Sequence, residues 1–287
     1  MDVTSWLDMW YTTYVEPCHG LAPSTKAMYR RAKDAVPAWL GALPLDDQLL
    51  PLHLTRWLAQ VAVEHPRAAQ LDRVMLSRAL RIAGKLGLCS RTVIDTDTVP
   101  KPVHEARKAL IFDLAQSRAY MEAARSSDCY PLLMLCLCGL RRGEALGARW
   151  QDLDGAMLQI RRQRQRIDGA YSTRPLKSDH SQRALMLPAW LVADLASWPR
   201  TITGWIVDTT PEHLQRAHKH VLAEAQLPPV TLHGLRHTFA TQAATQGVAM
   251  KQLQVAMGHS KLQLTADLYA DHLSPLSDLP ALVWQAL

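Results

Sequence analysis

Apolar residues recur at helical spacing through most of residues 1–90 and predict helices there. One helix is expected to begin at Ser24 or Thr25 and to run to Trp39. A second apolar stripe lies near residues 54–61, and a third helix is expected over 67–86. Basic side chains share these segments, so the pattern fits either a solvated helical bundle or a bundle that faces a phosphate backbone.

The helical pattern stops over residues 91–102, whose sequence is RTVIDTDTVPKP. Two prolines and a polar, β-prone run are typical of a connecting segment. We therefore expect a linker there, between a first domain over residues 1–90 and a second domain over 103–287.

The second domain is predicted to begin with helices over 103–123 and 131–138, and a short one over 143–150. The run 131–138 is apolar on all sides, which indicates a buried helix. From Met157 the period changes, and turn residues at Asp168-Gly169 and near Ser178 separate strand-like runs. This alternation predicts a small three-stranded antiparallel β-meander in a mainly α-helical chain.

Helices are expected again after Pro188. Thr210 and Pro211 suit the N-cap and first position of a helix that runs to about Gln226. Three shorter helices are predicted over 233–245, 250–257 and 262–269. The tail after residue 272 is apolar for a chain end, so we expect it to dock on its own core or on a neighbouring subunit.

Composition limits the classes of partner and compartment. The net charge is +6 and the pI is about 9.2, which fits a polyanionic partner without requiring one. The five cysteines are odd in number and form no Cys-x-x-Cys motif, so neither a disulfide framework nor a zinc knuckle is indicated. The N-terminus does not resemble a signal peptide, and no apolar run approaches the length of a membrane span. A reducing cytoplasm is the expected location.

Candidate chemistry begins with His233 and Arg236, which lie three residues apart and share a helix face. A guanidinium stays charged and can bond two oxygens of one phosphate. His237 follows His233 by four residues, a spacing that also suits a metal pair. However, no glutamate follows His233 as in the H-E-x-x-H motif. We expect His237 instead to be a hydrogen-bonded core histidine beneath the site, with no bound metal.

Four further candidates are weak when taken singly. Arg141 follows a buried helix, and Lys177 stands at the mouth of the second predicted turn. His259 follows Gly258 at a helix break, where a histidine is usually unremarkable. Tyr269 ends an amphipathic helix, where a tyrosine is usually half-buried packing.

Taken together, these segments resemble a known family. GLRRGE, a lysine before a polar turn, HGLRHTFAT, MGHS and TADLYADH occur in this order, as in the tyrosine recombinases of the phage integrase family. The resemblance covers residues 103–273. It is looser in the N-terminal half, where LAPSTKAMYRRA resembles the start of the family's core-site DNA-binding domain. Ser178 departs from the threonine that many members carry. The six matching catalytic positions are Arg141, Lys177, His233, Arg236, His259 and Tyr269.

The resemblance implies a transesterification that needs neither a metal nor ATP. Tyr269 would attack the scissile phosphate, forming a 3′-phosphotyrosyl link and releasing a 5′-hydroxyl. Arg141 and Arg236 would stabilise the charge on the phosphorane. Lys177 would protonate the leaving oxygen. His233 would act as base and acid, and His259 would bond the phosphate.

The resemblance also implies partners and supporting residues. Glu144 would orient the region of Arg141. Family members act as tetramers on double-stranded DNA, exchange a C-terminal segment and pass through a Holliday junction. The basic residues expected to contact DNA are Lys26, Arg30, Arg31, Arg73, Arg161, Arg162 and Arg164; the clustered arginines could equally form a solvated strand face.

Three alternatives remain distinguishable by experiment. A non-catalytic DNA-binding relative would trap no covalent adduct. A type IB topoisomerase would relax supercoiled plasmid without a specific site. A metal-dependent nuclease would need an acidic cluster, and none surrounds the motifs. The sequence does not choose among phage or island integrases, chromosome-dimer resolvases and integron or transposon recombinases.

Overall fold

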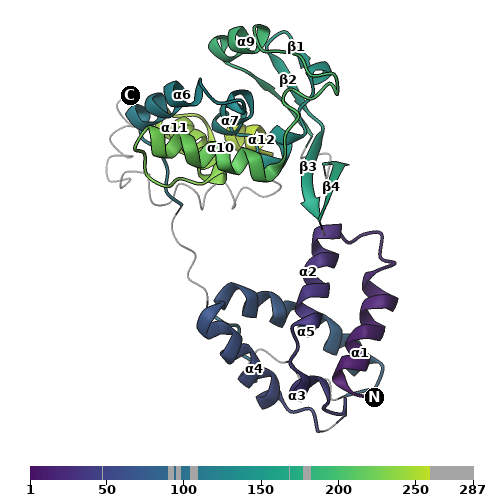
Figure 1. Ribbon diagram of the computed structural model, residues 1–287. Helices are drawn as coiled ribbons and strands as arrows, with labels where there is room; N and C mark the ends of the chain where they lie inside the picture. The colour runs from purple at the N-terminus through teal and green to yellow at the C-terminus, as the bar shows by residue number, and fades with distance from the viewer. Residues whose placement is uncertain are drawn as a thin grey trace, which may run out of the picture. The chain divides into compact units, whose positions relative to one another are not determined.

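The chain divides into two compact units, Met1–Arg107 and Lys108–Leu287. The computed structural model describes residues 1–46, 48–89, 94, 98–103, 109–167, 169–176 and 182–258 (Figure 1). Helices dominate the described residues, and small antiparallel sheets occur in the second unit. None of the described helices is long and apolar enough to cross a membrane.

The first unit is built from helices and short connections. One helix expected to end at Trp39 is in fact two, because Pro37 has no N–H and disfavours helical backbone at the residue before it. The second apolar stripe and the third predicted helix are confirmed as α4 and α5. The elements are α1 (Val3–Trp10), the π-helical turn η1 (Tyr11–Val15), α2 (Pro23–Asp34), α3 (Ala38–Gly41), α4 (Pro51–Glu64) and α5 (Pro66–Lys85).

The last residues of the expected linker pack on the first unit. Val99 is fully buried in its core, and its carbonyl accepts a hydrogen bond from Arg73 Nε at 2.8 Å. The carbonyl of Pro102 accepts another from the Gln70 side chain at 2.9 Å. The two units therefore meet in sequence at 107/108, a few residues beyond the expected boundary.

Local capping sets where the helices of the second unit begin. The sequence predicts a helix from Val103, but residues 109–113 are not helical and α6 begins at Leu114. Asp113 caps it by accepting from Gln116 N at 2.7 Å while the Gln116 side chain accepts from Asp113 N. Thr210 caps α10 as predicted. The helical elements are α6 (Leu114–Ala124), α7 (Tyr130–Leu137), α8 (Arg142–Leu146), the 3₁₀ turn η2 (Trp150–Asp152), α9 (Ala189–Ala196), α10 (Pro211–Glu224), α11 (Leu232–Thr245) and α12 (Met250–Met257).

The predicted three-stranded meander is wrong in its pairing. The expected first strand breaks at Arg161, and its halves β2 and β3 join different sheets. Leu158 and Ile160 in β2 are buried in the core, whereas the Arg-Gln repeat of β3 has no apolar face to bury. The sheets have the orders β1-β2-β5 and β3-β4, with β1 (Leu153–Asp154), β2 (Met157–Ile160), β3 (Arg162–Ile167), β4 (Ala170–Pro175) and β5 (Arg183–Met186).

The predicted hairpin at residues 168 and 169 is confirmed, because Ile167 pairs with Ala170 across a two-residue turn. Gly169 has φ +83°, which suits glycine in such a turn. The β3–β4 hairpin extends beyond the sheet formed by β1, β2 and β5 (Figure 1).

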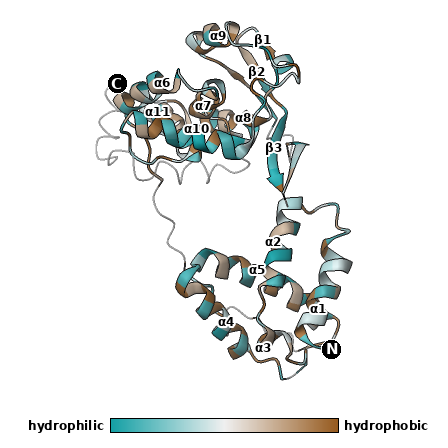
Figure 2. Cartoon of the chain, viewed as in Figure 1, coloured by the Kyte–Doolittle hydropathy of each residue, from teal (hydrophilic) through white to brown (hydrophobic). Residues whose placement is uncertain are grey.

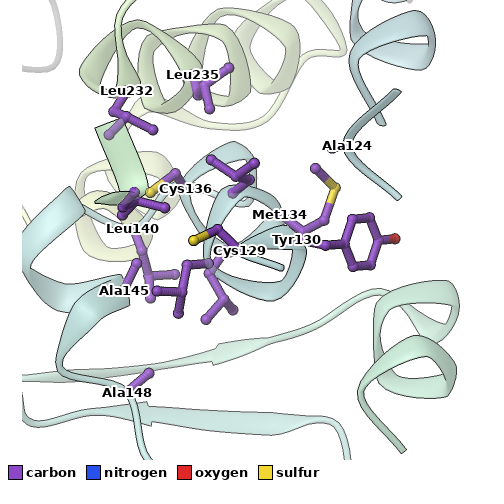
Figure 3. Close-up of a cluster of buried hydrophobic side chains, with 14 of the residues drawn as sticks. Ala124, Cys129, Tyr130, Met134, Cys136, Leu140, Ala145, Ala148, Leu232 and Leu235 are labelled. Carbon is purple, nitrogen blue, oxygen red and sulfur yellow. The ribbon is translucent and has the colours of Figure 1, made fainter. Parts of the chain in front are cut away.

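The core of the second unit surrounds α7, which is buried from Tyr130 to Cys136 as its all-apolar sequence predicted. Leu232 and Leu235 of α11 lie on one side of α7, and Ala145 of α8 lies on another (Figure 3). Gly139 follows α7 with φ +98°, and a Cβ there would meet the Phe239 ring at 2.8 Å. This packing fixes the end of α7, and hence the start of α8, against α11.

Candidate active site

Three of the six catalytic candidates fall within the described residues, and they come from two elements packed on the α7 core. Arg141 is the N-cap of α8, while His233 and Arg236 lie on the first turns of α11. The other three, Lys177, His259 and Tyr269, lie outside the described residues. The structure therefore describes the site only up to the residues that flank the β4–β5 connection, and up to Gly258 at the end of α12.

Glu144 connects the two elements. Its side chain is 1% exposed, and its Oε1 accepts a hydrogen bond from Arg141 Nη1 at 2.8 Å. Its Oε2 accepts from the backbone N–H of Arg141 at 2.8 Å and lies 3.8 Å from Arg236 Nη1. One buried carboxylate thus contacts both candidate phosphate-binding arginines.

Arg183, the first residue of β5, is a third arginine on this carboxylate. Its Nη1 donates to Glu144 Oε1 at 3.1 Å and its Nη2 donates to Oε2 at 2.9 Å. Sequence reasoning missed it, because a lone arginine in the run RALM has no motif to mark it. Its partner is 39 residues away in sequence, so only the folded chain brings the two together.

Arg183 and Arg141 keep Glu144 in its charged form. Burial alone would raise the pKa of this carboxyl, but the hydrogen bonds and charge of Arg183, followed by those of Arg141, lower it to about 2. Glu144 is therefore ionised at neutral pH.

Arg236 is fully buried. Its Nη1 donates to the carbonyl of Gly139 at 2.6 Å and its Nη2 donates to the carbonyl of Met257. Its Nε has no hydrogen-bond partner among the described residues. Burial, together with the charge of Arg141, lowers the pKa of Arg236 to about 9, so the guanidinium stays protonated at neutral pH.

The C-terminal end of α12 meets all three arginines. The carbonyls of Ala256, Met257 and Gly258 accept hydrogen bonds from Arg183 Nε, Arg236 Nη2 and Arg141 Nη2, respectively. Free carbonyls at a helix C-terminus carry partial negative charge, which favours cations there. Gly258 ends the helix in the left-handed conformation at φ 59°.

The two histidines of α11 pack edge to face. The ring centroids of His233 and His237 are 4.4 Å apart with an interplanar angle of 86°. Although His233 is exposed, partial shielding of its ring from water lowers the pKa of its imidazole, and the charges of Arg236 and Arg141 lower it further. Burial, His233 and Arg236 lower the pKa of His237 to about 4. Both rings are therefore neutral at pH 7.

His237 is half-buried, and within the described residues its ring contacts that of His233. Its expected role as a hydrogen-bonded histidine beneath the site stays a prediction. In the part of the chain that the structure describes, three metal-ligand side chains come together only at Asp128, Cys129 and His213. This group does not include the two site histidines.

The basic residues expected to contact DNA fall into two groups. Arg30, Arg31 and Arg161 are exposed, although Arg30 Nε also donates to the Tyr11 hydroxyl at 3.2 Å. Lys26 donates to the carbonyl of Glu16, and Arg73 is buried against Val99. The side chains of Arg30, Arg31 and Arg161 are thus open to solvent, whereas those of Lys26 and Arg73 form contacts within the first unit.

The arginines of β3 form intramolecular ion pairs. Arg162 donates through both Nη atoms to Asp152, whose side chain is 1% exposed. Arg164 pairs with Asp208 at 2.9 Å, and Arg166 pairs with Glu212 at 3.2 Å. The strand is hydrophilic (Figure 2), but this face of it is occupied by acids of the same unit.

Comparisons with known proteins agree with the motif pattern. Residues 97–274 match the family described as the phage integrase family. A tyrosine recombinase XerC of Pelobacter propionicus is 26% identical over 275 residues, covering 89% of this chain and 87% of the relative. A XerC of Rhodospirillum centenum is 30% identical over 259 residues, covering 82% of this chain and 70% of the relative. The chain spans only 43% of a XerC-like relative from Caldanaerobacter subterraneus, at 27% identity.

Solved structures show the same fold. The integrase of transposon Tn1549, in complex with a circular intermediate DNA, superposes with a TM-score of 0.79 at 18% identity over the whole of both chains. A lambda integrase dimer bound to a COC′ core site gives a TM-score of 0.73 at 19% identity, covering 96% of this chain and 98% of that chain.

We predict that Glu144→Gln lowers the free energy of unfolding at pH 7 by about 3–5 kcal/mol, because it leaves buried Arg183 without its counter-charge. The folded pKa of Glu144 is depressed to about 2, so its stabilisation is complete above the unfolded pKa of about 4.3 and is lost as pH falls toward 2. Urea titrations of both proteins should show a difference that shrinks below about pH 4.

The matched control is Glu122→Gln, which removes the exposed pair with Arg125 and should change stability little. A Glu144→Gln difference that stays constant from pH 7 to pH 3 would contradict an ionised, arginine-paired Glu144.

Proposed function

Because the chain belongs to the phage integrase family, we propose that it is a site-specific DNA recombinase that cleaves and rejoins strands through a phosphotyrosyl link. The observation that carries this proposal is the gathering of Arg141 and Arg236 on one buried carboxylate beside the end of α12. Two guanidinium groups with fixed geometry suit the non-bridging oxygens of a single phosphate diester.

The Nε of Arg236, which has no acceptor among the described residues, supports a phosphate site. A buried N–H without an acceptor costs about 1–3 kcal/mol, a cost that a bound ligand would remove. A phosphate oxygen is a charged acceptor that would satisfy Nε while Arg141 bonds the same group. Bonds from guanidinium to phosphate are also stronger than the present bonds from Arg236 Nη1 and Nη2 to neutral carbonyls, so phosphate could replace those as well.

In the proposed reaction the Tyr269 oxygen attacks the phosphorus, the new O–P bond links Tyr269 to the 3′ side, and the bond from phosphorus to the 5′-oxygen breaks. Lys177 donates a proton to that leaving oxygen. His233 accepts the phenol proton, a role that suits an imidazole held neutral at pH 7. Arg141 and Arg236 offset the charge that develops on the phosphorane.

His259 is assigned to the phosphate on the position of its neighbour. The carbonyl of that neighbour, Gly258, accepts a hydrogen bond from Arg141 Nη2 at 3.1 Å. The described chain therefore ends beside one of the two arginines proposed to bind the phosphate.

Rejoining reverses the first step. The 5′-hydroxyl of a partner strand attacks the phosphotyrosyl bond and releases Tyr269, so the bond energy is kept and ATP is not consumed. Two rounds of exchange pass through a Holliday junction. We propose that a homotetramer carries out these rounds, with the apolar tail after His272 joining subunits, and that the protein works in the cytoplasm.

Double-stranded DNA is the proposed partner of both units, with the first unit acting as a core-site binding domain. The Tn1549 and lambda integrases, which share this fold, are both described in complex with DNA. Arg31 and Arg161 are the strongest candidates for phosphate contacts because they are exposed; Arg30 is exposed too, but its Nε already donates to the Tyr11 hydroxyl. Lys26, Arg73, Arg162 and Arg164 already have partners within the chain, so their proposed contacts with DNA would have to share or replace these bonds.

We predict that wild-type protein traps a covalent adduct on a nicked duplex that carries its footprinted target site, and that Tyr269→Phe traps none. Arg236→Lys should form the adduct about 100–1,000-fold more slowly, because it removes preorganised donors to the phosphorane. Adduct formation is measured by denaturing gel electrophoresis.

Adduct formation should persist in EDTA, since no step of the proposed reaction uses a metal. Equal trapping by wild type and Tyr269→Phe would remove Tyr269 from the nucleophile role. Loss of all cleavage in chelator would favour a metal-dependent nuclease instead.

We predict that Arg31→Gln and Arg161→Gln each weaken noncovalent binding to the target duplex and reduce the slope of log K against log salt by about 1, as expected for one lost phosphate contact. Fluorescence anisotropy at several salt concentrations measures the slope. The control Arg125→Gln removes a guanidinium that pairs with Glu122 and Asp194 and should leave the slope unchanged. Slopes equal to the wild-type slope for both Arg31→Gln and Arg161→Gln would exclude these two residues from the interface.

A further inference from the structure

Arg183 is a buried arginine that none of the catalytic roles uses. Its side chain is 3% exposed, and its planar fork donates to both oxygens of Glu144. Its Nε donates to the carbonyl of Ala256 at 2.6 Å. A single guanidinium therefore ties the start of β5 to α8 on one side and to the last turn of α12 on the other.

The hydrogen bonds from Arg183 to Glu144 help to determine the orientation of Arg141. Glu144 accepts from both the side chain and the backbone N–H of Arg141, and it can do so as an anion only while its own burial is compensated. Arg183 provides the largest compensation for that burial. Without it, the carboxylate that orients Arg141 would lose its principal partner.

The bond to Ala256 controls the end of α12. A Cβ on Gly258 would lie 2.9 Å from Arg183 Nη1, so glycine at this position lets the backbone approach the guanidinium closely. With Ala256 held by Arg183, the next two carbonyls face Arg236 and Arg141. The register of this last turn thus decides where the chain leaves toward residue 259.

Arg183 is also the first residue of β5, directly after the β4–β5 connection that carries Lys177. The described chain before that connection ends at Leu176, whose N–H donates to the Arg161 carbonyl at 3.3 Å. After the connection, Arg183 pairs with Ile160 in the β2–β5 register. Both described ends are therefore fixed beside the end of β2, and Arg183 fixes one of them.

We propose that Arg183 is a positioning residue for strand cleavage, which holds Glu144 and the end of α12 in register so that Arg141 and Arg236 meet one phosphate. This inference rests on the proposed recombinase function. Lysine in its place keeps the charge, but a single ammonium does not reproduce the planar fork that spans two carboxylate oxygens and a carbonyl. The geometry, rather than the charge alone, is the contribution of Arg183.

The test compares Arg183→Lys with wild type on the nicked target duplex. Three quantities are measured: the affinity of the noncovalent complex, the single-turnover rate constant for adduct formation, and the Tm. We expect unchanged affinity and a rate constant about 100-fold lower, because misplacing catalytic groups slows chemistry more than binding. A merely structural role would lower the Tm and leave the rate constant of the folded protein intact.

The matched control is Asp152→Asn, which weakens another buried carboxylate–arginine pair of the same unit, Asp152 with Arg162. It should lower the Tm comparably and cleave at the wild-type rate. A second route to the same perturbation is Gly258→Ala, whose methyl group would push against Arg183 at the buried C-cap of α12. It should also slow adduct formation without weakening DNA binding.

The outcomes separate two claims. If wild-type protein forms the adduct and either Arg183→Lys or Gly258→Ala forms it at the wild-type rate, the positioning role of Arg183 is overturned, whereas the proposed function stands. An equal loss of rate in Asp152→Asn also overturns the positioning role, because the effect would then follow stability. No adduct with wild-type protein overturns the proposed function, and this inference with it.

Discussion

Three guanidinium groups lie around one buried carboxylate, and the rest of the candidate site depends on that ion cluster. Arg141, Arg183 and Arg236 would repel one another in a dry interior, and Glu144 is the counter-charge that holds them together. The cluster keeps an excess of positive charge, which suits a phosphate diester. The packing of the α7 core offsets the free-energy cost of burying these charges, and it fixes α8 and α11 against each other before any ligand binds.

The end of α12 completes this arrangement. Its last three carbonyls point at the same three arginines, so the helix terminus and the ion cluster stabilise each other. A phosphate that enters the site would compete with these carbonyls for donors. A bond between a guanidinium and an ionised phosphate joins two charged groups and is stronger than a bond to a neutral carbonyl, so these arginines could release the carbonyls to bind substrate.

Sequence patterns predicted α7, α10, α11 and α12 because each depends on local periodicity and caps. The break at Pro37 was also local, and a stricter use of the proline rule would have found it. Strand pairing was not predictable in this way, because the partner of β2 is chosen by burial of Leu158 and Ile160. Motifs marked Arg141, His233 and Arg236, which the fold brings into one region, while Lys177, His259 and Tyr269 stay predictions from sequence.

Long-range ion pairs explain most of what the sequence did not reveal. The arginines of β3 pointed to a nucleic acid or to solvent, yet Arg164 pairs with an acid 44 residues away. Arg183 had no motif, and its role follows from contacts with two distant elements. Such partners depend on the tertiary fold, so no local pattern identifies them.

The most direct measurement is a crystal structure of Tyr269→Phe bound to an intact target duplex. We expect guanidinium nitrogens of both Arg141 and Arg236 at about 2.7–3.0 Å from non-bridging oxygens of one phosphate, with Glu144 still bonded to Arg141 and Arg183. A complex in which Arg236 keeps its bonds to the Gly139 and Met257 carbonyls, while the phosphates all lie elsewhere, would contradict the central claim.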